Sequence, residues 1–104
     1  MATDYIVLRE SEEQGRIAIS KSVFLSIAEI TINEIENIVV TAKWPVSVKI
    51  EDNQLKLETD VKVKYGANVN ATCSLVQNKI YENILFMTGF KPSDITVNVT
   101  GFEI

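Results

Sequence analysis

The sequence predicts an α+β fold, in which two helices cover one face of a mostly antiparallel sheet of four to five strands. Residues 54–65 alternate strictly between polar and apolar side chains, which is typical of a long strand with one buried face. Two other segments, which begin near residues 20 and 68, repeat their apolar residues at helical spacing. The connections are short, so we expect one two-layer domain with the order strand, helix, three strands, helix and strand.

The N-terminal region is expected to be the least ordered part of the chain. Residues 1–14 are mostly polar and acidic after Leu8, so we interpret them as a loosely held lead-in with a marginal strand at residues 5–8. The domain proper is predicted to occupy residues 15–104. It begins with a short alternating strand at residues 16–19.

The first helix is predicted to start after Ser20, whose hydroxyl can accept a backbone N–H of the first turn. Val23, Ile27 and Ile30 stand at positions i, i+4 and i+7 and are expected to share the buried face of this helix. Residues 38–42 are rich in β-branched side chains and predict the next strand.

A hairpin is predicted from residues 46–51 and 54–65, because a short Asp-Asn connection between two alternating segments forces antiparallel pairing. The dipeptide Trp44-Pro45 precedes it. Proline lacks a backbone donor and restricts the residue before it, so we expect a break or an edge position there.

The second helix is predicted to begin at an N-cap formed by Asn68 or Asn70 and to end at Gly89, which suits a left-handed C-terminal cap. Its apolar stripe comprises Leu75, Val76, Ile80, Ile84 and Met87. The last strand covers residues 95–104. Its alternation slips by one position at Gly101, which predicts a β-bulge.

Length and composition limit the class of protein. A chain of 104 residues with 46% hydrophobic and 23% charged residues is expected to fold around a single core. The net charge of −4 argues against a general polyanion binder, because nucleic acids and anionic lipids are bound mostly by clustered Lys and Arg. The first ten residues show no signal-peptide pattern, and the single Cys73 cannot form an intramolecular disulfide. Both features favour the cytoplasm.

The sequence offers few groups for catalysis. It contains no histidine, which removes Ser-His, Cys-His and His-metal arrangements together. Cys73 is interpreted as a structural thiol near the start of the second helix, with a redox role as the alternative. Three acidic pairs are expected on the solvated surface and not in an acid–base or metal site: Glu34 with Glu36, Glu51 with Asp52, and Glu58 with Asp60. We therefore assign no catalytic, cofactor-binding or metal-binding residue.

The candidate partner surface lies on the polar phase of the hairpin. It comprises Trp44, Lys49, Lys56, Lys62 and Lys64. The lysines are expected to share the open face of the sheet. Acidic residues alternate with them, so the first interpretation is a mixed-charge face that keeps the protein soluble. The functional alternative is a site for an anionic partner, a protein in preference to a nucleic acid. The tryptophan is either partly buried at the rim of the core or an exposed contact residue.

Residues 15–104 resemble the alkaline shock protein family, also called the Gram-positive envelope stress response family. The matching motifs, in family order, are Gly15-Arg16-Ile17-Ala18-Ile19-Ser20, Tyr65-Gly66, Val76-Gln77, Met87-Thr88-Gly89 and Val97-Asn98-Val99 through Gly101. The chain departs from the family where Lys43-Trp44-Pro45 replaces a longer segment that often carries glycine. The resemblance implies a cytoplasmic protein that is associated with envelope stress, held at the membrane by a separate anchor protein, and without an agreed catalytic activity.

Together these observations predict a non-enzymatic interaction or scaffold protein linked to the cell-envelope stress response. It is expected to bind protein partners, including a membrane-anchor protein, through its surface and to need no cofactor. Self-association is expected through an open edge strand, which leaves a row of backbone N–H and C=O groups without partners. The alternative is a nucleic-acid-binding module that uses the lysine-bearing face.

Overall fold

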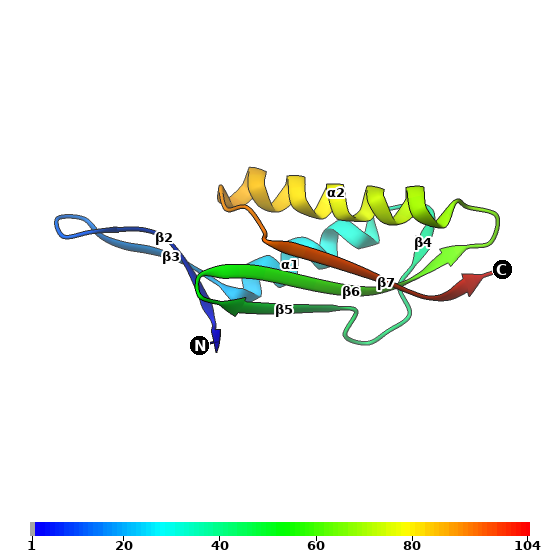
Figure 1. Ribbon diagram of the computed structural model, residues 1–104, viewed down its shortest axis with the longest axis horizontal. Coiled ribbons are helices and arrows are strands. Elements are labelled where there is room, and N and C mark those ends of the chain that lie inside the picture. The colour runs from blue at the N-terminus through cyan, green and yellow to red at the C-terminus, as the bar shows by residue number, and fades with distance from the viewer. Residues whose placement is uncertain (1) are drawn as a thin grey trace.

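A computed structural model describes residues 2–104 and confirms the α+β class (Figure 1). Two antiparallel helices, α1 (Lys21–Asn33) and α2 (Val69–Thr88), cover one face of a sheet. The strands are β1 (Ala2–Thr3), β2 (Tyr5–Ser11), β3 (Gly15–Ser20), β4 (Ile38–Val39), β5 (Val46–Glu51), β6 (Gln54–Lys64) and β7 (Asp94–Glu103).

Strand β6 is the centre of the five-stranded sheet. β5 and β4 pair antiparallel with successive parts of β6, and β7 pairs parallel with the whole of residues 56–64. The residues of β6 that pair with β7 include residues that also pair with β5 and with β4. β7 must therefore lie along one edge of β6, and β4 and β5 must lie along the other edge. The parallel pairing is the exception in a mostly antiparallel sheet, and it follows from the connection, since a strand that returns through a helix runs parallel to the strand before it.

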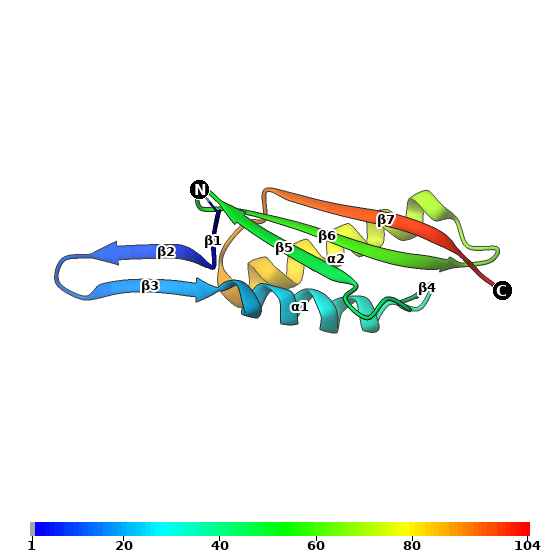
Figure 2. The ribbon, with the colours of Figure 1, turned by 90° about the horizontal axis from the view of Figure 1, so that it is seen from below.

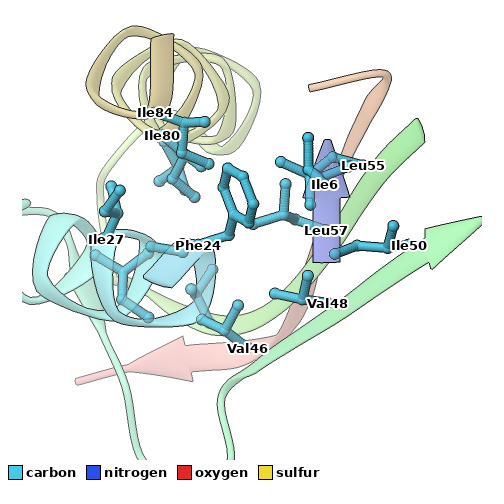
Figure 3. Close-up of a cluster of buried hydrophobic side chains, with 14 of the residues drawn as sticks. Ile6, Phe24, Ile27, Val46, Val48, Ile50, Leu55, Leu57, Ile80 and Ile84 are labelled. Atoms are coloured by element: carbon cyan, nitrogen blue, oxygen red, sulfur yellow. The ribbon is translucent and has the colours of Figure 1, made fainter. Parts of the chain in front are cut away.

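The alternation of β5 and β6 places every second side chain in the core, as predicted from period two. The core side of the hairpin consists of Val46, Val48, Ile50, Leu55, Leu57, Thr59, Val61 and Val63. They belong to one buried cluster with Phe24, Ile27, Ile80 and Ile84 of the two helices, and Figure 3 shows Val46, Val48 and Leu57 of the hairpin facing these helix side chains. Two residues with positive φ, Asp52 (53°) and Asn53 (55°), make the tight turn between the strands.

The buried stripe of α1 differs from the predicted one. Phe24, Ile27, Ala28, Thr31 and Ile32 are buried. Val23 and Ile30 were expected in the core, but their side chains are 42% and 61% exposed. The helix is rotated so that the ring of Phe24 enters the core, where its centroid lies 6.3 Å from that of Phe90. The larger aromatic surface buried in this way favours this phase over the aliphatic one.

Helix α2 has the predicted caps but a narrower apolar stripe. The Asn68 side chain accepts the N–H of Ala71 at 2.9 Å, and Gly89 has the left-handed φ of 76°. Thr72, Val76, Ile80 and Ile84 form the buried stripe. The expectation that Leu75 and Met87 belong to this stripe is wrong, because both side chains are exposed.

The N-terminal segment differs most from expectation, although Met1 lies outside the described residues. Instead of a loose lead-in with a marginal strand, residues 5–11 form the full strand β2, paired with β3 in a separate two-stranded sheet. The strand expected at residues 16–19 therefore does not join the main sheet. This hairpin extends from one end of the body (Figure 2), and the molecule measures 56 × 23 × 18 Å.

The bulge predicted in the last strand is present. Val61 pairs with Val99, but the next residue of β6, Lys62, pairs with Gly101, so Thr100 has no counterpart. The extra residue turns Phe102 to the helix side of the sheet, in register with Val63.

The cap at Gly89 predicts a measurable stability difference between two glycines. We expect Gly89→Ala to lower the free energy of unfolding by about 1 to 2 kcal/mol, because an L-residue is strained at this φ. Gly101→Ala is the matched control, since its φ lies outside the left-handed region and an added Cβ meets no atom within 4 Å. Urea unfolding measures both. Equal losses in the two variants would contradict the assignment of the cap.

Two buried threonines predict changes of opposite sign. The Thr59 hydroxyl has no hydrogen-bond partner within the described part of the chain, so Thr59→Val is expected to stabilise the fold by about 1 kcal/mol. The Thr31 hydroxyl donates to the Ile27 carbonyl at 2.7 Å and accepts from the Asn83 amide at 2.9 Å, so Thr31→Val is expected to cost about 1 to 3 kcal/mol. Urea midpoints that move in the same direction would refute this interpretation.

Candidate functional site

The open face of the sheet carries the predicted lysines. Lys49, Lys56, Lys62 and Lys64 all stand on the side of β5 and β6 that faces away from the helices. Lys49 lies directly opposite Lys56 in the strand register. Like charges in facing positions repel one another, so this arrangement costs stability unless other groups offset it.

Acidic groups divide the lysines into two pairs. Glu58 and Asp60 stand between Lys56 and Lys62 on β6, and the Asn98 side chain of β7 donates to both carboxylates, at 2.9 and 3.0 Å. Lys62 stands six positions after Lys56 along the strand, which corresponds to about 20 Å. The open face is therefore not one continuous cationic stripe but two cationic ends with an acidic centre.

One end of this face is partly neutralised. The Lys49 Nζ lies 3.0 Å from a carboxylate oxygen of Glu51. The hydrogen bond and the charge of Lys49 lower the pKa of Glu51. A shallow hollow of about 230 Å³ beside this end is lined by Lys49, Lys56, Glu58 and Asp94, among others. The ion pair is exposed, so it contributes little to stability.

Trp44 is an exposed residue in the loop that leads into β5, which meets β6 at Asp60, two positions before Lys62. Its side chain is 79% exposed, so the interpretation as a partly buried rim residue is wrong and that of an exposed residue is confirmed. The loop that carries it ends at Pro45, whose carbonyl accepts the N–H of Asp60 at 3.0 Å. Lys43 stands over the indole ring, with its Nζ 5.7 Å from the ring centroid, within the range of a cation–π contact.

A pair of aromatic side chains near the end of β6 was not predicted. Tyr65 and Phe102 are 75% and 54% exposed, and their rings meet edge to face with centroids 6.5 Å apart. The signal for this pair was the change of phase at Gly101, because the bulge brings Phe102 to the same side as Tyr65. Lys64 and Glu103, which pair in the register, stand next to them in the two strands but on the opposite, open face of the sheet.

The remaining candidate groups lie apart from one another. Glu34 and Glu36 line a hollow of about 470 Å³ between the C-terminal end of α1 and Leu75 and Lys79 of α2. Within residues 2–104, no three Asp, Glu or Cys side chains gather in a way that could hold a metal ion. Neither helix of the described chain is both long and apolar enough to cross a bilayer.

Residues 41–104 match the family model of the alkaline shock proteins, a family described as having a cell envelope-related function. The match covers more than half of the 104 residues. The chain belongs to the alkaline shock protein family. The resemblance to the alkaline shock proteins is thus confirmed, but the match does not bear on the Gram-positive origin, and it begins at residue 41 and not at the expected residue 15. A comparison with curated proteins found no match.

The matched region of this alkaline shock family chain contains the whole candidate partner surface. Residues 41–104 include Trp44, the four lysines and the pair of Tyr65 and Phe102. They exclude the β2–β3 hairpin and helix α1. The part of the chain that matches the family is thus the part that builds the open face and its ends.

The environment of Cys73 predicts a slow thiol. The residue is partly buried within α2, and burial raises the pKa of its thiol above the usual value. Less thiolate is therefore present at neutral pH than for a free cysteine, and the thiolate is the reactive form. We expect maleimide to label the folded protein more slowly than the urea-unfolded protein at pH 7 to 8, with the folded rate still rising above the pH at which the unfolded rate levels off. Faster labelling of the folded protein would revive the redox alternative.

Proposed function

We propose that this protein acts by binding a protein partner at the Trp44 end of its open face, and that it serves the cell envelope as an interaction or scaffold protein. The exposure of Trp44 carries the proposal. A tryptophan that is 79% exposed presents a large apolar surface to water, and tryptophan is the residue type most often found as an energetic centre of protein interfaces.

The surroundings of Trp44 indicate the chemistry of the partner. Lys43 covers the ring, and Lys62 and Lys64 stand on the adjacent part of β6, whose backbone is joined to the Trp44 loop through the bond from Asp60 to Pro45. An apolar centre with a cationic rim fits a segment that carries an apolar or aromatic residue next to acidic residues. The second end of the open face, with Lys49 and Lys56, is less suited to binding an acidic segment, because Glu51 already forms an ion pair with Lys49.

Binding without catalysis agrees with the chemistry of the chain. The sequence has no histidine, and the one cysteine has a raised pKa. We propose a cytoplasmic location, with association to the membrane through a partner that is itself anchored there. This part of the proposal rests on the envelope-related family and on the resemblance to the alkaline shock proteins.

The nucleic-acid alternative has less support from the geometry. A single-strand or RNA-binding sheet usually presents aromatic side chains for base stacking among its basic residues. Here the lysines of the open face are separated by Glu58 and Asp60, which are held together by Asn98. An acidic centre of this kind repels a phosphate backbone.

The proposal predicts which surface variants lose the partner. We expect Trp44→Ala, and separately Lys62→Glu with Lys64→Glu, to weaken capture of partner proteins from native-cell extract by about 30-fold, because loss of an interface centre costs about 2 kcal/mol. The matched controls are Phe86→Ala, which removes an aromatic ring that is 90% exposed on α2, and Lys79→Glu with Lys91→Glu. Quantitative mass spectrometry of the co-purified proteins gives the readout.

Three outcomes separate the hypotheses. Loss of the same proteins in both test variants, with retention in both controls, supports the proposal. Equal capture by all variants refutes it. Release of co-purified RNA by the lysine variant, with a steep dependence on salt and no effect of Trp44→Ala, would favour the nucleic-acid alternative.

A further inference from the structure

The outer edge of β7 is an open strand edge. β7 pairs with β6 along one side, and no strand within residues 2–104 pairs with its other side. Figure 2 shows β7 as one margin of the sheet. The opposite margin is partly covered, because β1 pairs with Ile50 and Glu51 of β5. β7 thus has the longest uncovered edge among the strands described in this sheet.

The backbone groups of Val97 and Val99 point away from β6. The side chain of Gln77 in α2 donates to the Ile95 carbonyl at 3.0 Å, so this carbonyl faces the outer edge. Backbone groups at every second residue of a strand point to the same side, so those of Val97 and Val99 face outward as well. The bulge at Thr100 ends this alternation. The free edge therefore consists of the N–H and C=O groups of Val97 and Val99, for which the described residues offer no partner.

The ladder between β6 and β7 agrees with this direction. The Asp60 N–H donates to the Pro45 carbonyl at 3.0 Å, so the even-numbered residues of β6 turn their backbone groups toward β5. Leu57 and the other odd-numbered residues before the bulge turn theirs toward β7. In a parallel ladder only one of two residues in register faces the partner strand, so Ile95, which is in register with Leu57, faces outward.

The sequence of β7 does not protect this edge. Natural proteins usually blunt an open edge with lysine, proline, a bulge or a covering element. β7 contains no Lys, Arg or Pro over its ten residues, and its bulge comes only after Val99. The bond from Gln77 covers a single carbonyl at the start of the strand. An edge of this kind accepts a further extended chain, whose main-chain groups pair with those of the free edge.

The helix side of the free edge has room for apolar side chains. A shallow hollow of about 260 Å³ lies between α2 and the start of β7. Its lining includes Gln77, Tyr81, Pro92 and Ile95. Val99 is in register with the buried Val61 and points to the same side, but it is 36% exposed. Alternate side chains of an added strand would enter the hollow and cover Val99, so this side favours apolar residues.

The open side of the same edge is acidic at its centre. Glu58 and Asp60 of β6 stand next to β7 at the level of the free edge, and in the described strands neither has a Lys or Arg in register. Lys56 and Lys64 are in register with the carboxylates at the two ends of β7, so only the centre lacks a base. An arginine on the open side of an added strand would lie about 10 Å from β6, close enough for two long side chains to meet. This side therefore favours basic residues.

We propose that the outer edge of β7 binds an extended segment of a partner protein in which apolar and basic residues alternate. A second copy of β7 fits this edge poorly, because the strand carries Asp94 and Glu103 and no base, and two such strands would bring like charges together. The site is separate from the Trp44 loop, which meets β6 on the side of β5. It therefore goes beyond the function proposed above.

The first test is amide hydrogen exchange, measured by NMR on the full-length protein with and without a short end-capped peptide of alternating valine and arginine. The Val97 and Val99 amides are expected to exchange fast in the free protein and about tenfold more slowly at saturating peptide. Thr96 and Asn98 face β6, so their amides should be slow in both samples. A peptide in which all valines precede all arginines is the control for charge alone, and it should bind much more weakly.

Variants of Val99 test the backbone contact. Val99→Pro removes one outward N–H, and an edge strand tolerates proline where the N–H faces solvent. We expect it to raise the Kd of the alternating peptide about tenfold relative to Val99→Thr, which keeps the N–H and the β-branched shape. Urea unfolding checks the fold of each variant. Trp44→Ala should leave the Kd of the peptide unchanged.

The outcomes separate the possible occupants of the edge. Slow exchange at Val97 and Val99 with the peptide, and a larger loss of affinity in Val99→Pro than in Val99→Thr, supports the proposal. Equal binding of the two peptides, or equal losses in the two variants, overturns it. Protection of both amides without peptide that grows with protein concentration would assign the edge to a second copy and also overturns it. Because the peptide assay does not involve Trp44, the two proposals can fail separately.

Discussion

The pairing of β6 along both of its edges is the constraint on which the rest of the structure depends. This strand receives β5 and β4 on one side and β7 on the other, so its main-chain groups are satisfied within the sheet. Its apolar side chains can then lie only on one face or the other. Leu55, Leu57, Val61 and Val63 face the helices, which leaves the charged residues of the same strand on the open face. The hydrophobic core and the candidate site thus lie on the two faces of the same alternating strand.

The same alternation explains why much of the fold could be predicted. Period two in residues 54–65 admits a single assignment of sides, because a shift by one residue would bury every lysine of the strand. The helical stripe of α1 was less determined. Its sequence contains two overlapping apolar sets, and only the three-dimensional packing of Phe24 on Phe90 decides that Phe24 is buried and Val23 and Ile30 are exposed. The spacing of apolar residues therefore predicts that a helix is present more reliably than it predicts which face of the helix is buried.

The features missed in the sequence are those that depend on distant residues. Strand β2 has the sequence of a loose lead-in because the residues after Leu8 are polar, whereas the base of its hairpin with β3 is fixed by the amide of Asn53, which is 46 residues away from Val7 in the chain. The exposure of Trp44 depends on how the Pro45 carbonyl meets β6, and a sequence motif of Trp-Pro does not contain that contact. The lysines, by contrast, lie where the strand phase puts them, although only the structure shows that Asn98 holds an acidic centre between them.

These distinctions separate two parts of the molecule. Residues 41–104 carry the match to the alkaline shock protein family, and they include the long strands β5, β6 and β7 together with the open face. The β2–β3 hairpin precedes this region, yet the turn between β5 and β6 holds it, because the Asn53 side chain donates a hydrogen bond to the carbonyl of Val7.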